Sequence, residues 1–139
     1  MRRLVIDTKV YIDWLDKGWH EDVLFPRDSV KYLSAVVLME LRAGATTRAD
    51  RRVVRRLQTA FARAGRILAP SREVFAQAGD ALRRLQVEAG YDLRRSHSIV
   101  NDVLIAMSAR SIGATVVTRN ERDYRAIARI RPFRLAVVG

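Results

Sequence analysis

Residues 96–118, SHSIVNDVLIAMSARSIGATVVT, contain the pattern that decides the fold. Apolar side chains between Ile99 and Met107 cover almost every side of a helix, and a helix that is apolar all round is buried in a core. Gly113 ends this helix, and residues 114–118 then form a short β-branched strand. The stretch therefore predicts a buried helix that leads into a buried strand, as in an α/β domain.

The same alternation continues along the rest of the chain. We expect strands at residues 3–6, 30–35, 66–69, 114–118 and 133–138, and helices at 8–15, 38–45, 50–64, 71–89, 96–111 and 121–130. The second strand could also be the lead-in to a helix, and residues 17–27 are expected to be a loop or a short helix. The strands lack period-two alternation, which favours a parallel sheet between two layers of helices. Right-handed crossovers make this α/β/α arrangement Rossmann-like, and we expect a single domain over residues 1–139.

Composition excludes several classes of protein. The 139 residues include no cysteine and only two histidines, so disulfide scaffolds, thiol nucleophiles and Cys- or His-rich metal sites are excluded. No apolar run approaches the about 20 residues of a membrane span. Asp7 stops the first apolar run after three residues, whereas a signal peptide needs roughly 7–15, so we expect a cytoplasmic protein.

The charge balance points to a polyanion or an acidic partner. The formal net charge is +11, and only three of the 26 basic residues are lysines. Guanidinium groups suit bidentate phosphate contacts and stacking on bases, so a nucleic acid is a natural partner. The alternative is that an arginine-rich genome places these residues on solvated faces.

Three carboxylates lie in unusually apolar surroundings. Asp7 follows the first strand, Glu40 follows the run 36–39, and Asp102 lies inside the apolar helix. An unpaired buried carboxylate costs several kcal/mol or takes up a proton. Each of these acids could instead cap a helix or pair with an arginine.

Strand ends can bring these acids together. The carboxyl ends of parallel strands meet at one edge of a sheet, and ligands bind there. Asp7 lies at one such end, and Asn120 and Asp123 follow another strand that closes at Thr118. Converged carboxylates repel one another, and a divalent cation with oxygen ligands, Mg²⁺ or Mn²⁺, relieves the repulsion. Such an ion can activate water against a phosphodiester.

Other α/β chemistries have less support. No glycine-rich loop follows the first strand, which removes Walker-type and dinucleotide-binding interpretations. The only lysines precede residue 32, so a phosphate-accepting receiver domain lacks its late lysine, and no serine has a hydrolase-triad pattern.

Four sequence blocks together resemble those of PIN (PilT N-terminus) domains. They are Asp7-Thr8-x-Val10-x-Ile12, Leu38-Met39-Glu40-Leu41-x-x-Gly44-Ala45, Asn101-Asp102-x-x-Ile105-Ala106 and Val116-Val117-Thr118-Arg119-Asn120-x-x-Asp123-Tyr124. The blocks run in the family's order and span nearly the whole chain. The compact length is similar to that of VapC toxins of bacterial type II toxin–antitoxin pairs.

The resemblance implies a PIN-like sheet of four to five parallel strands and an Mg²⁺- or Mn²⁺-dependent endoribonuclease. It implies that Asp7 and Asp102 are the main metal ligands, that Glu40 is the third acid, and that Asn120 or Asp123 fills the fourth position. VapC-like members usually form homodimers, and a small antitoxin inhibits them with a C-terminal segment over the active cleft. A metal-activated water would then attack phosphorus in line, leaving a 3′-hydroxyl end.

One residue departs from the family pattern. Lys9 stands where the family usually has Asn or Ser, and its ammonium group could pair with Asp7 or Asp102 and compete with the ion. It could equally point outward and bind phosphate. The alternative function is therefore a non-catalytic or attenuated module that binds RNA or an antitoxin, and a weaker alternative is cleavage of DNA. Five arginines are candidates for guiding the RNA backbone: Arg42, Arg94, Arg95, Arg119 and Arg122.

Overall fold

A computed structural model describes all 139 residues and contains one five-stranded, all-parallel sheet. The strands occur in the order β3-β2-β1-β4-β5. Their bounds are β1 Arg2–Ile6, β2 Ser29–Ser34, β3 Ile67–Leu68, β4 Thr115–Thr118 and β5 Arg134–Val137. The predicted α/β class and parallel sheet are confirmed.

The strand order reverses next to β1. From β1 the chain moves outward to β2 and β3, and it then returns to place β4 on the other side of β1. The register pairs Ile6 with Val117, so the carboxyl ends of β1 and β4 are neighbours. This is the topological switch point, where a ligand crevice forms in open α/β sheets.

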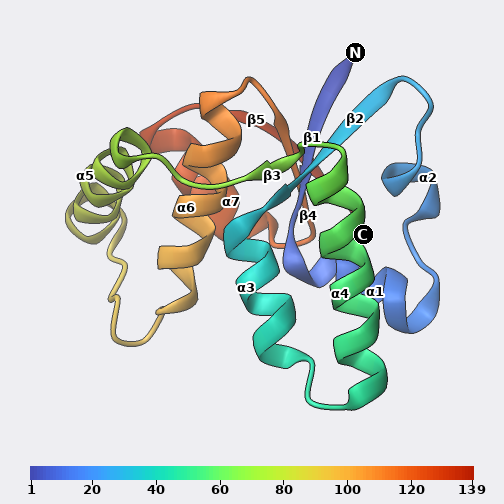
Figure 1. Cartoon of the computed structure of the whole chain (residues 1–139). Coiled ribbons are helices and arrows are strands. Elements are labelled where there is room, and N and C mark those ends of the chain that lie inside the picture. The colour runs from blue at the N-terminus through green and yellow to red at the C-terminus, as the bar shows by residue number, and fades with distance from the viewer.

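Two groups of helices cover the sheet. In the first group α3 packs against both α1 and α4, and α5, α6 and α7 pack against one another in the second group. Figure 1 shows α1 and α3 beginning where β1 and β2 end. The bounds are α1 Thr8–Lys17, α2 Glu21–Leu24, α3 Ala35–Gly44, α4 Arg48–Arg63, α5 Arg72–Ala89, α6 Ser98–Ser111 and α7 Glu121–Ile130.

The main correction concerns the start of α3. The helix begins at Ala35, not at residue 38, because the Ser34 side chain accepts hydrogen bonds from the backbone N–H groups of Val36 and Val37. Glu40 consequently lies in the middle of α3 and not near its start. The predicted second strand, 30–35, is likewise a strand that ends at Ser34.

The core confirms the interpretation of the apolar helix. Six apolar side chains of α6 are fully buried: Ile99, Val103, Ile105, Ala106, Met107 and Ala109. They pack in a single core cluster with the strand residues Leu4, Val5 and Ile6. No helix in the structure combines the length and apolar character that crossing a membrane requires.

Candidate active site

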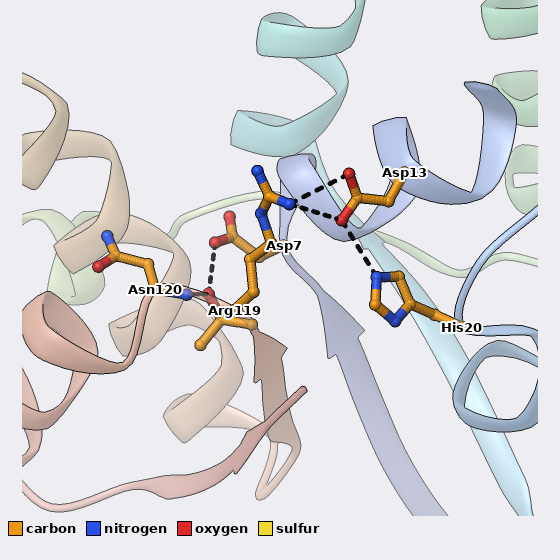
Figure 2. Close-up of polar contacts among 6 residues, drawn as sticks. Asp7, Asp13, His20, Arg119 and Asn120 are labelled. Carbon is orange, nitrogen blue, oxygen red and sulfur yellow. Dashed lines mark hydrogen bonds and ion pairs between the residues drawn. The ribbon is translucent and has the colours of Figure 1, made fainter. Parts of the chain in front are cut away.

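Asp7 is fixed at the junction of β1 and α1. Its backbone N–H donates to the Val117 carbonyl at 2.9 Å, which continues the pairing of β1 with β4. Its Oδ1 accepts the Thr8 backbone N–H at 2.8 Å. Its Oδ2 accepts the Thr118 hydroxyl at 2.8 Å, which is the dashed line from Asp7 in Figure 2. Asp7 is 7% exposed, so its bonded carboxyl group occupies a defined position at the switch point.

Asp102, Asn120 and Asp123 form a connected group beside it. Asn120 caps α7, and its Nδ2 donates to Asp123 Oδ2 at 3.0 Å and more weakly to Asp102 Oδ2 at 3.4 Å. The buried Tyr124 hydroxyl donates to Asp102 Oδ1 at 3.4 Å. Tyr91, in the connection between α5 and α6, donates to Asp123 Oδ1 at 2.7 Å. The amide of Asn120 therefore orients two carboxylates that come from different helices.

Glu40 approaches the same site from α3. Its Oε1 accepts the Thr8 hydroxyl at 2.9 Å, and the side chain is half-buried. Thr8 thus links Glu40 to Asp7, because its backbone N–H is bonded to Asp7. We define the acid centre as Asp7, Glu40, Asp102 and Asp123.

The charges of neighbouring acids contribute to the raised pKa values of Asp102 and Glu40. Burial raises the pKa of Asp102 to about 8, and the charges of Asp7, Asp123 and Glu40 add to the effect. Burial also raises the pKa of Asp7 and Glu40, with the Asp7 charge contributing at Glu40. No arginine or lysine forms an ion pair with any member of the acid centre. The centre therefore carries mutually repelling acids in a strongly basic protein.

The acids do not form a ready-made ligand cage. No three Asp, Glu or His side chains are grouped closely enough to hold an ion as they stand. Their donor atoms are nevertheless all oxygens, and their shared repulsion is what a hard divalent cation relieves. The chemistry of the donor set fits Mg²⁺ or Mn²⁺.

Comparison with known proteins identifies the family. The family model described as PIN domain matches residues 4–130. The chain belongs to the PIN domain family. A search of curated proteins finds no match.

Solved structures share the fold of this PIN domain over almost its full length. VapBC2 from Rickettsia felis, bound to a DNA fragment from its promoter, matches with a TM-score of 0.71 and 21% identity over 99% of both chains. FitAcB from Neisseria gonorrhoeae matches with a TM-score of 0.68 and 26% identity over 95% of both chains. VapBC-5 from Mycobacterium tuberculosis, a member of a toxin–antitoxin family, has a TM-score of 0.65 and 26% identity, over 99% of this chain and 100% of that one.

Lys9 lies at the rim of the PIN domain's acid centre. Its side chain is exposed and makes no ion pair, but its charge acts against the raised pKa of both Asp7 and Glu40. Lys9 is therefore close to these two acids without being bonded to either.

The five candidate arginines occupy different places. Arg119 lies between Thr118 and Asn120, and Arg122 is exposed in the first turn of α7. Arg94 and Arg95 are exposed in the connection before α6. Arg42 donates to the Gln58 side chain of α4 at 2.8 Å, so it lies over the seam between α3 and α4. Their contacts with RNA stay a prediction.

The sequence reasoning missed Asp13. Its side chain is 8% exposed, and the carboxylate accepts from Arg119 Nη1 at 3.0 Å and lies 3.1 Å from His20 Nε2 (Figure 2). This contact ties α1 and the following turn, where His20 has a left-handed φ of 67°, to the loop after β4. Asp13 stands between the apolar residues Ile12 and Trp14. Apolar neighbours of this kind are also what marked Glu40 as a candidate.

A groove adjoins the acid centre between α1, α3 and α4. It has a volume of about 250 Å³, and its lining includes Glu40. Its apolar wall includes Ile12, Leu15 and Val53, and the acids Asp16 and Asp50 also border it. The groove is therefore apolar with an acidic border, unlike most of this basic molecule.

Proposed function

We propose that this PIN domain is an Mg²⁺- or Mn²⁺-dependent endoribonuclease and the toxin of a VapC-type pair. The observation that carries the proposal is the acid centre itself. Asp7 at the start of α1 and three acids from α3, α6 and α7 lie near the switch point without an ion-pair partner, although the chain has a net charge of +11. Arginines for structural ion pairs are abundant in this chain, so the lack of an ion pair to any of the four acids supports a cationic ligand.

Asp7 and Asp102 would hold the cation, with Glu40 and Asp123 supporting it directly or through water. When bound, the cation supplies charge neutralisation and the activation of water for phosphodiester hydrolysis. The surrounding side chains orient the acids: Thr118 fixes Asp7, Thr8 fixes Glu40, and Asn120 fixes both Asp102 and Asp123. Arg119 stands at the edge of the same site and offers a guanidinium to a phosphate of the RNA.

The groove beside Glu40 supports an antitoxin as the partner. An amphipathic segment with basic side chains would bury its apolar face against Ile12, Leu15 and Val53 and place its charges near Asp16 and Asp50. Such a segment would also cover the approach to Glu40. VapBC-5 is described as a member of a family of toxin–antitoxin systems, which supports the same assignment. We propose a homodimer as the toxin's own assembly.

A cleavage assay tests the nuclease. RNA and DNA of one sequence are incubated with the purified chain in Mg²⁺, Mn²⁺ or EDTA, beside the variants Asp7→Asn and Asp102→Asn. Asp80→Asn, which changes an exposed acid on α5, is the matched control. We expect the natural chain to cut RNA only when the metal is present. Both acid-centre variants should lose this cleavage, and the control should retain it. Cleavage in EDTA, or cleavage by both acid-centre variants, would contradict the proposal, and DNA cuts alone would reassign the substrate.

The position of Lys9 favours one alternative, a non-catalytic or attenuated RNA- or antitoxin-binding module. The ammonium group acts on Asp7 and Glu40 and could occupy the place of the ion. Lys9→Asn separates the two functions. A large increase in cleavage would show that the natural chain is attenuated, whereas an unchanged rate would show that the enzyme tolerates Lys9.

A further inference from the structure

The outer face of α4 carries the densest charge in the molecule. The helix contains one acid, Asp50, and six arginines: Arg48, Arg51, Arg52, Arg55, Arg56 and Arg63. All six arginine side chains are exposed, and Val54 is the only fully buried residue of the helix. Neither the core nor the acid centre explains so many arginines on one helix.

Four of these arginines line one shallow groove. Arg52, Arg55, Arg56 and Arg63 border it together with Thr59 and Ala60, and its volume is about 380 Å³. We call these four the arginine face.

The charge of the arginine face is not compensated. None of its four guanidinium groups makes an ion pair or a side-chain hydrogen bond, whereas four other arginines each pair with an acid three or four residues away: Arg83, Arg84, Arg95 and Arg125. The arginine face therefore has free donors for an anionic ligand.

Adjoining pockets connect the arginine face with the groove beside the acid centre. Arg55 also borders a smaller pocket of about 80 Å³ with Arg42 and Arg51. Two other residues of that pocket, Ala45 and Val54, border the groove that contains Glu40. A polyanion bound along α4 could thus reach the acid centre across the seam between α3 and α4.

The chemistry of the arginine face selects a phosphate backbone. Arg52 and Arg63 are eleven residues apart, which corresponds to about 16 Å along a helix and to several phosphates of one strand. Apart from the guanidiniums, the groove offers only Thr59 and Ala60, so it has no aromatic side chain on which an unpaired base could stack. Contacts of this kind read the shape and charge of a duplex and not its sequence.

We propose that the arginine face binds the phosphate backbone of a base-paired segment of RNA, at a distance from the acid centre. The proposal rests on the proposed function for the identity of the polymer. It gives the protein a preference for folded RNA over an unstructured strand.

The test compares two sets of substitutions in a chain that also carries Asp102→Asn, so that binding is measured without cleavage. Arg52→Gln, Arg55→Gln and Arg56→Gln neutralise the arginine face, and glutamine is a good helix former. Arg2→Gln, Arg72→Gln and Arg134→Gln are the control, because they remove equal charge from exposed positions outside α4. Circular dichroism melting checks that both variants fold. The probes are a fluorescent RNA hairpin and an unstructured RNA of the same length.

We expect the arginine-face variant to bind the hairpin about tenfold more weakly or worse. The control variant should lose less affinity for the hairpin. The slope of log K against log salt should fall by about 2 to 3 in magnitude, because three phosphate contacts are lost. Equal hairpin affinities of the two variants, or equal losses for hairpin and unstructured RNA, would overturn the proposal. Binding is measured here without cleavage. A chain that shows these affinity losses but never cuts RNA would therefore contradict the proposed nuclease activity and leave the proposal for the arginine face intact.

Discussion

Asp102 is the residue that links the acid centre to stability. Burial, with the charges of Asp7, Asp123 and Glu40, raises its pKa from 3.8 to about 8 in the folded chain. Between these two values the folded protein binds a proton that the unfolded chain releases. The free energy of unfolding of the metal-free protein therefore falls as pH rises through this window, by at most about 1.4 kcal/mol per pH unit from Asp102.

Asp102→Asn removes this contribution. Urea denaturation in EDTA measures the unfolding free energy at pH 5 and pH 8. This free energy should fall more from pH 5 to pH 8 in the natural chain than in Asp102→Asn. Asp80→Asn should behave like the natural chain, because Asp80 is exposed and lies outside the acid centre. Equal losses in all three proteins would contradict the raised pKa.

Asp13 has a structural role that mutation can measure. Asp13→Ala leaves the largely buried His20 without its partner and releases Arg119. We expect a loss of about 1–3 kcal/mol in unfolding free energy, mostly from His20, because the half-exposed Arg119 is screened by solvent. Asp16→Ala, at an exposed position of the same helix, is the control and should lie within about 0.5 kcal/mol of the natural chain. Equal stability of the two variants would contradict this role.

Sequence alone could locate Asp7 and Asp102, because acids in such apolar surroundings conflict with burial. It did not find Asp13, although the same conflict is visible there, since no family block drew attention to it. The sequence also could not predict which hydroxyl groups bond to these acids. Thr118 meets Asp7 across 111 positions of sequence, and only strand pairing brings them together.

At the scale of elements, the cap of α3 controls the position of Glu40. The Ser34 side chain is fully buried and accepts from two backbone N–H groups of α3. Ser34→Ala leaves these donors without a partner and should lower the unfolding free energy by about 1–2 kcal/mol. It should also weaken metal binding, because α3 carries Glu40.

Ser71→Ala is the matched control for this cap. Ser71 begins α5 and accepts from the Val74 backbone N–H, but α5 contributes no member of the acid centre. Its loss should cost about 1 kcal/mol and leave metal affinity unchanged. Metal binding that is equally weakened by both substitutions, measured calorimetrically, would contradict the role of the α3 cap.

Most elements could be predicted from the sequence, and the exception has a physical cause. The helix from Ser98 to Ser111 carries apolar side chains on most of its sides and packs in the core as expected. The predicted start of α3 was wrong because Ala35, Val36 and Val37 are apolar and directly follow β2, so the residue pattern does not mark where the strand ends. Only the geometry of Ser34 shows that the chain has already turned into a helix there.

At the scale of the whole molecule, apolar patterning indicates a parallel sheet but not the order of its strands. The position of β1 between β2 and β4 depends on long-range packing, and it is this order that creates the switch point. Convergence of the acids could therefore be expected from the sequence, whereas the hydrogen bonds that orient them could not.

The overall charge gives a prediction about salt. A net charge of +11, from 26 basic and 15 acidic residues, should make RNA binding electrostatic. With 6–10 phosphate contacts, affinity should fall by about 10³–10⁵ between 50 and 200 mM salt. Fluorescence anisotropy with a labelled RNA over this range measures the slope, and a flat response would contradict phosphate binding by the arginines.

The central claim is that the acid centre holds a divalent cation, and isothermal titration calorimetry with Mn²⁺ tests it most directly. The natural chain and Asp80→Asn should show saturable binding at pH 8. Asp7→Asn and Asp102→Asn should lose it, since each removes a carboxylate from the centre. Absence of binding to the natural chain, or equal binding to Asp102→Asn, would contradict the claim.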